Sequence, residues 1–221
     1  MASEPVPDWL RRLLVGGFLA SLLLVLVVAA VLALGAADPH PVGSLAWKSN
    51  FIPTEQDNWQ LVLGEPGNAV FDEGGLTFDL SASDSPVFAW RPATDGTYTL
   101  TATGAQLAGP SGALYGIVFG YIAVDDYAAV LINNNGFVLA YRQNREEQIF
   151  WLPLQQWPHV LLEDEKNELR VDVEHEATTI LINSEVLLTV PNATSGGVGV
   201  LAIPQDSGQV VQFSSAQFWS E

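Results

Sequence analysis

The chain has 221 residues, 48% of them apolar, a formal net charge of −17 and no cysteine. This length and apolar content suffice for one domain with a well-buried core plus an accessory segment. The acidic charge excludes nucleic-acid binding, and the lack of cysteine excludes disulfides and thiolate metal sites, so the core alone must stabilise the domain.

The first long segment is apolar. Residues 13–37 carry no charge, and Ser21 supplies their only side-chain hydroxyl. At ~1.5 Å per residue, a helix of this length extends roughly 37 Å, whereas the hydrocarbon core of a bilayer is ~30 Å thick. The pattern predicts a transmembrane helix over 13–37 that follows a short N-terminal segment, residues 1–12.

A cleavable signal peptide is the alternative, because Gly35-Ala36-Ala37 offers small residues of the kind that a signal peptidase accepts. We favour an uncleaved anchor, since the apolar part of a signal peptide usually has only ~7–15 residues. Arg11 and Arg12 directly precede the span, so the positive-inside tendency predicts a cytoplasmic N-terminus. We therefore expect a single-pass protein of the cell membrane whose C-terminal domain is extracytoplasmic.

A short linker, D-P-H-P-V-G-S-L-A at 38–46, is predicted to follow the span, and its two prolines stiffen it. From residue 47 to 221, short β-branched and aromatic runs recur between Gly, Asn, Asp and Pro clusters. The run 97–103, T-Y-T-L-T-A-T, alternates polar and apolar residues, and Asn135-Gly136 separates two apolar runs, as in a hairpin. The pattern predicts an all-β, antiparallel two-sheet sandwich over 47–221.

The order of these runs resembles a known fold family. The relevant segments are Y-G-I-V-F-G-Y (115–121), D-D-Y-A-A-V-L-I (125–132), G-F-V-L-A-Y (136–141), N-E-L-R-V-D-V (167–173), T-I-L-I-N-S-E-V (179–186) and G-G-V-G-V-L-A (196–202). Together they resemble concanavalin A-like jelly rolls of the laminin-G-like and 3-keto-disaccharide-hydrolase-type groups. The resemblance implies a jelly-roll sandwich and says little about function. Ser184 departs from it, standing where the family pattern often has a glycine.

Three carboxylates, Asp172, Glu174 and Glu176, are the only catalytic candidates. Jelly-roll glycoside hydrolases of the laminarinase type carry three carboxylates on alternate strand positions, but the order of Asp and Glu differs here. The strand period of two instead places Val171 and Val173 in the core and the acids in water. We expect a solvated strand surface rather than an active site.

No cofactor is expected, and calcium is the one metal that we consider. The few histidines do not form a zinc ligand set. Laminin-G-like domains hold calcium at the sandwich rim, so the resemblance points to Asp125 and Asp126 as weak candidate ligands.

The segment 115–152 is apolar on both faces of its strands. One face fills the core, and the other must meet a covering segment, a partner protein or a glycan. The covering segment would be Q-Q-W-P-H-V-L-L at 155–162. For a glycan or partner site, aromatic and cationic side chains are available on the concave sheet: Tyr121, Tyr127, Tyr141, Arg142, Arg145 and Trp151.

The sequence thus predicts a membrane-anchored binding module. Our first hypothesis is an accessory subunit that docks on another membrane or cell-surface protein, because the anchor and short linker keep the domain at the membrane. A carbohydrate-binding module is the alternative, and a glycoside or keto-disaccharide hydrolase is the third hypothesis.

Overall fold

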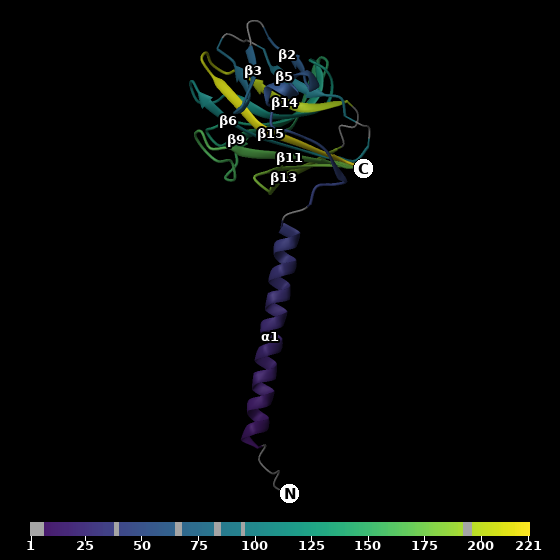
Figure 1. The fold of residues 1–221 in the computed structure, drawn as a ribbon, viewed down its shortest axis with the longest axis vertical. Helices are drawn as coiled ribbons and strands as arrows, with labels where there is room; N and C mark the ends of the chain where they lie inside the picture. The colour runs from purple at the N-terminus through teal and green to yellow at the C-terminus, as the bar shows by residue number, and fades with distance from the viewer. Residues whose placement is uncertain (1–6, 38–39, 65–67, 82–84, 94–95, 192–195) are drawn as a thin grey trace. The chain divides into compact units, whose positions relative to one another are not determined.

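The computed structural model describes residues 7–37, 40–64, 68–81, 85–93, 96–191 and 196–221, in two compact units, Met1–His40 and Pro41–Glu221. The first unit contains helix α1 (Asp8–Ala37; Figure 1). Its stretch Trp9–Val31, with a mean hydropathy of 2.8, is long and apolar enough to cross a membrane. The helix begins earlier than residue 13, because the carbonyl of Pro7 accepts hydrogen bonds from the amides of Leu10 and Arg11.

The second unit consists of two antiparallel sheets (Figure 1). The eight-stranded sheet has the order β13-β12-β11-β6-β15-β4-β3, and β1 also pairs with β15. Its strands are β1 (Ser44–Ser49), β3 (Asn68–Asp72), β4 (Gly75–Asp79), β6 (Tyr98–Ala108), β11 (Asn167–Val173), β12 (Ala177–Ile182), β13 (Glu185–Pro191) and β15 (Val210–Ser220).

The seven-stranded sheet has the order β10-β9-β8-β7-β14-β5-β2. Its strands are β2 (Gln60–Val62), β5 (Val87–Arg91), β7 (Leu114–Ala123), β8 (Asp126–Ile132), β9 (Phe137–Asn144), β10 (Glu147–Gln156) and β14 (Gly197–Ile203). A 3-10 helix, η1 (Pro53–Asn58), precedes β2. The predicted all-β, two-sheet jelly roll is confirmed. Because β1 already pairs with β15 from Ser44 onward, the sandwich includes the last residues of the predicted linker.

The main core lies between the two sheets and follows the expected alternation. From the eight-stranded sheet, Leu169 and Val171 on β11 are fully buried, and from the seven-stranded sheet Val130 and Ile132 on β8 are too. Burying each such side chain contributes about 1.5–3 kcal/mol. Successive strand residues point to opposite faces, so the residues between these positions lie on the two outer faces of the sandwich.

Two hairpin turns adopt a left-handed backbone, the second of them although it has no glycine. Gly136 in the β8–β9 turn has φ +84°, and the Asn133 side chain accepts hydrogen bonds from the backbone amides of Asn135 and Phe137. In the β12–β13 turn, Asn183 and Ser184 have φ +51° and +68°. Ser184 therefore occupies a conformation that favours glycine.

Candidate functional sites of the sandwich

The three predicted tyrosines meet on the outer face of the seven-stranded sheet. Tyr121, Tyr127 and Tyr141 come from β7, β8 and β9, and the hydroxyls of Tyr127 and Tyr141 are 2.9 Å apart. Phe88 packs against Tyr121 and Tyr127, with ring centroids 5.4 and 5.2 Å away. All three tyrosines are buried, and Tyr141 is only 1% exposed. The rings therefore pack on one another instead of forming an open platform.

Burial also makes these phenols harder to ionise. Loss of solvation raises the pKa of Tyr121, Tyr127 and Tyr141 above the usual value. All three are neutral at physiological pH. Together with Val118, Leu131 and Leu201 they form a second, separate apolar cluster, called here the tyrosine face.

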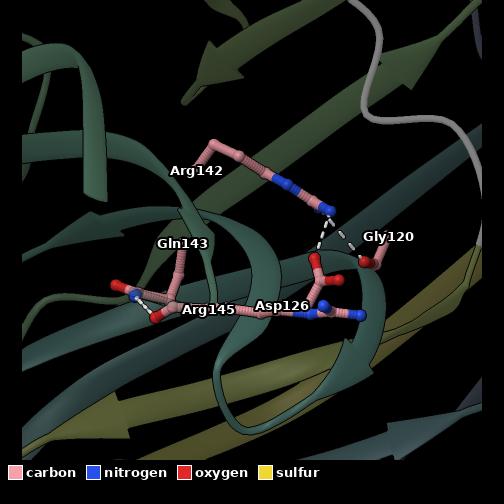
Figure 2. A network of polar contacts seen from close by, with 5 residues as sticks. All are labelled: Gly120, Asp126, Arg142, Gln143 and Arg145. Atoms are coloured by element: carbon pink, nitrogen blue, oxygen red, sulfur yellow. Dashed lines mark hydrogen bonds and ion pairs between the residues drawn. The ribbon is translucent and has the colours of Figure 1, made fainter. Parts of the chain in front are cut away.

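The other three residues of the predicted platform lie elsewhere. Figure 2 shows the guanidinium of Arg142 directed at the Asp126 carboxylate, with which it forms an ion pair, and at the carbonyl of Gly120. Arg142 neighbours Tyr141 on β9 and so points to the opposite face. Trp151 packs against Phe119, whose side chain belongs to the inter-sheet core.

Arg145 lies in the β9–β10 turn, where its carbonyl accepts a hydrogen bond from the Gln143 side chain (Figure 2) and its amide donates to the carbonyl of Asp125. The structure thus brings the tyrosines together and separates them from Arg142, Arg145 and Trp151. Ligand binding by these six residues stays a prediction.

The predicted covering segment does not lie on the tyrosine face, which corrects that expectation. Val160 is part of the inter-sheet core, and Trp157 packs against the same core. The amide of Trp157 donates to the carbonyl of Gly136, which holds the segment at the β8–β9 turn. The segment is therefore held on the inter-sheet core through Val160 and Trp157.

The weak calcium candidates are engaged within the protein. The Asp126 carboxylate pairs with Arg142, and the carbonyl of Asp125 accepts the Arg145 amide. Among the residues that the structure describes, no group of three or more His, Cys, Asp or Glu could hold a metal ion. Calcium binding stays an untested prediction.

The catalytic candidates separate into a buried and an exposed group. Asp172 was expected to face water, but it is 7% exposed, as is Arg170 on the same face of β11. Its Oδ1 accepts hydrogen bonds from the Arg170 Nε at 2.8 Å and the Thr99 Oγ1 at 2.6 Å. The backbone amide of Val42 donates to Thr99 at 2.9 Å. Asp172 is therefore held in a hydrogen-bonded group on this outer face.

Glu174 and Glu176 lie beyond the end of β11, in the turn that leads to β12. Both are exposed and line an open cavity together with His175 and Glu221. Asp172 does not line that cavity. The three carboxylates therefore do not form one strand face beside one cleft, which is the arrangement that a hydrolase of the laminarinase type requires.

A cavity that sequence reasoning missed lies between the β8–β9 turn and the segment after β10. It has a volume of about 340 Å³, and we call it the Trp157 cavity. Its lining has one aromatic ring, two amide side chains and no charged group: Asn135, Gly136, Gln156, Trp157, Pro158, Val160 and Leu162. The Asn-Gly turn and the Trp-Pro pair were both visible, but nothing in the sequence indicated that they meet.

No protein-family model matches the chain, and no curated protein sequence matches it. Solved structures match over most of the sandwich. The carbohydrate binding module CBM66 from Bacillus subtilis is 14% identical with a TM-score of 0.59, covering 74% of this chain and 96% of that one. The VIP36 exoplasmic/lumenal domain in its Ca²⁺/mannose-bound form is 9% identical with a TM-score of 0.58, covering 80% and 91%.

The Crh5 transglycosylase in complex with NAG is 12% identical, with a TM-score of 0.56 over 83% of this chain and 88% of that one. At these identities the likeness shows the fold alone. The protein therefore has the concanavalin A-like jelly-roll fold that lectin-like and glycosidase-type domains share, and the family resemblance seen in the sequence is confirmed at that level.

Proposed function

We propose that the protein is a membrane-anchored carbohydrate-binding module. The observation that carries this proposal is the likeness to CBM66, which extends over 96% of that carbohydrate binding module. The likeness to VIP36 in a mannose-bound form agrees with it. These neighbours favour the second of our sequence-based hypotheses over the first.

A hydrolase is less well supported. Crh5 is a transglycosylase on the same fold, so the fold is compatible with catalysis. Retaining glycosidases, however, need two carboxyl groups ~5–5.5 Å apart on either side of the sugar. Of the carboxylates suggested by the sequence, Asp172 is held by Arg170 and Thr99 away from the cavity that Glu174 and Glu176 line. We therefore assign Asp172 a structural role.

The membrane part of the proposal rests on α1, which is longer than the apolar part of a cleavable signal. Arg11 and Arg12 near its start favour a cytoplasmic N-terminus and an extracytoplasmic sandwich. The hydrogen bond from Val42 to Thr99 begins the folded domain only five residues after Ala37. At ~3.3–3.6 Å per residue, a fully extended chain of that length reaches less than about 20 Å, so the module would work close to the bilayer.

The proposal is tested with the full-length protein in nanodiscs of uncharged lipid, applied to immobilised neutral polysaccharides: β-glucan, mannan, galactan and fructan. We expect retention on at least one of them, with empty nanodiscs as the control. If the protein is retained on none of these and on no neutral glycan of a broad array, the carbohydrate-binding proposal is wrong.

Docking on another membrane protein is the second candidate. It is favoured by exposed apolar side chains at the tip of the β7–β8 hairpin, Ile122 and Val124, and on the edge strand β10, Ile149 and Phe150, which are exposed by 44–59%. Apolar side chains on an unpaired edge strand are a surface that a partner protein can bury. Light scattering after extraction in mild detergent from the native membrane should then show a larger assembly, and a lone monomer would exclude this candidate.

A further inference from the structure

The Trp157 cavity is open and uncharged and has an aromatic wall, and its frame is held by backbone hydrogen bonds. The amide of Gly136 donates to the carbonyl of Asn133, and that of Trp157 donates to the carbonyl of Gly136. The amide of Val160 in turn donates to the carbonyl of Trp157. The aromatic wall is therefore fixed to the β8–β9 turn.

A buried asparagine holds the other end of the segment. Asn167 is fully buried, and its side chain both accepts from the amide of Leu161 at 2.7 Å and donates to the carbonyl of Leu161 at 3.0 Å. The residues on either side of Leu161 line the cavity. A cavity formed in advance lowers the conformational entropy that the protein loses when a ligand binds.

The lining combines two kinds of surface. Trp157, Pro158, Val160 and Leu162 provide an apolar side, which suits the C–H face of a sugar ring. Asn135 and Gln156 are exposed, and their side-chain amides have no hydrogen-bond partner within the part of the chain that the structure describes. An amide both donates and accepts, which matches the hydroxyl groups of a sugar.

Charge and size narrow the class of ligand. No charged side chain lines the cavity, but Glu163, Asp164 and Glu165 follow Leu162 directly, and the whole protein carries −17. An anionic sugar would be repelled at this position. The volume of about 340 Å³ lies near the lower end of the ~300–1,000 Å³ that is typical of ligand pockets, which suits one ring rather than several.

We propose that the Trp157 cavity is a subsite for a single neutral hexose ring of a glycan, with the ring on Trp157 and its hydroxyls on Asn135 and Gln156. The inference rests on the proposed carbohydrate-binding function and assigns that function to a place. It also moves the binding site away from the tyrosine face, whose rings are closed to solvent.

The test uses the full-length protein in nanodiscs and the neutral polysaccharide that retains it best. Binding is measured by isothermal titration for Asn135→Ala and Gln156→Ala, with Gln148→Ala as the matched control, because Gln148 is an exposed glutamine on the same strand as Gln156. Each cavity variant is expected to weaken binding about threefold to tenfold, and the control to leave it unchanged.

Trp157→Phe keeps an aromatic ring in the wall and reduces its area, so weaker binding with unchanged folding is expected there as well. Polygalacturonate, an anionic polymer, should bind more weakly than the neutral polysaccharide. If the wild type binds and the three cavity variants bind as well as it does, the site is wrong although the proposed function stands. Binding of polygalacturonate as tight as that of the neutral polymer overturns the ligand class, and no binding by the wild type overturns both proposals.

Discussion

The two outer faces of the sandwich differ in chemistry, yet each of them buries side chains that the sequence suggested for a site. The outer face of the seven-stranded sheet is apolar and is closed by the packed rings of Tyr121, Tyr127 and Tyr141. The outer face of the eight-stranded sheet is polar, and there Thr99, Arg170 and Asp172 are buried in a hydrogen-bonded group. Polar residues in the sequence therefore did not indicate an exposed surface on the eight-stranded sheet, and apolar ones did not indicate an open binding platform on the seven-stranded sheet.

The largest expected effect comes from a substitution on the polar outer face of the eight-stranded sheet. Asp172→Ala removes the carboxylate that faces the buried Arg170, and losing one partner of a buried ion pair costs about 3–5 kcal/mol. We expect the free energy of unfolding of the sandwich to fall by that amount, measured by urea denaturation of the detergent-solubilised protein with tryptophan fluorescence.

Glu168→Gln is the matched control, because Glu168 is an exposed acid on the same face of β11. Its effect should stay within about 0.5 kcal/mol, as for most surface substitutions. Replacing both partners, Arg170→Met with Asp172→Leu, should restore much of the lost stability. Equal effects of Asp172→Ala and Glu168→Gln would mean that the network on the polar face contributes nothing.

The contrast between the faces also explains what could be predicted from the sequence. The jelly roll was predictable because alternation and turn residues are local: Leu169 and Val171 point into the core, and Gly136 forms its turn, as expected. The burial of Asp172 was not predictable, since its hydrogen-bond partner Thr99 lies 73 residues away in the sequence. The Trp157 cavity likewise depends on a tertiary contact between Trp157 and Gly136.

The pH dependence of stability tests the buried phenols. Loss of solvation raises the pKa of Tyr115 to about 12 from the usual 10. The folded state favours the neutral phenol, so the unfolded state loses its proton first as the pH rises. This stabilisation is complete below pH 10 and is lost as the pH rises from 10 to 12, by roughly 3 kcal/mol.

Urea denaturation at pH 9 and pH 11.5 measures this loss. Tyr115→Phe cannot ionise and should lose less stability between the two values than the wild type does. The variant should still lose some stability at high pH, because the pKa of the buried Tyr98 is also raised by loss of solvation. An identical loss in wild type and variant would show that Tyr115 does not contribute.

A hydroxyl pair tests whether the tyrosine face is structural. Tyr141→Phe leaves the buried hydroxyl of Tyr127 without its partner at 2.9 Å, which is expected to cost about 1–3 kcal/mol. The double variant with Tyr127→Phe should cost less than the sum of the two single variants, because neither hydroxyl is then left unpaired. Glycan binding should not change in the double variant. If binding is lost while the protein stays folded, the glycan site lies on the tyrosine face instead.

The smallest expected effect concerns the hairpin turns of the two sheets. Ser184 has φ +68°, in a region that costs a non-glycine residue up to about 1–2 kcal/mol, so Ser184→Gly should stabilise the β12–β13 hairpin by about 1 kcal/mol or less.

In the other sheet, Gly136→Ala should destabilise the β8–β9 hairpin, because residue 136 has φ +84° and an added Cβ would lie 3.0 Å from the Leu162 side chain. Thermal unfolding of both variants gives the signs. Only Gly136→Ala should also weaken glycan binding, since Gly136 lines the Trp157 cavity and Ser184 does not. If both variants bind the glycan equally well, the β8–β9 turn does not contribute to the proposed sugar subsite.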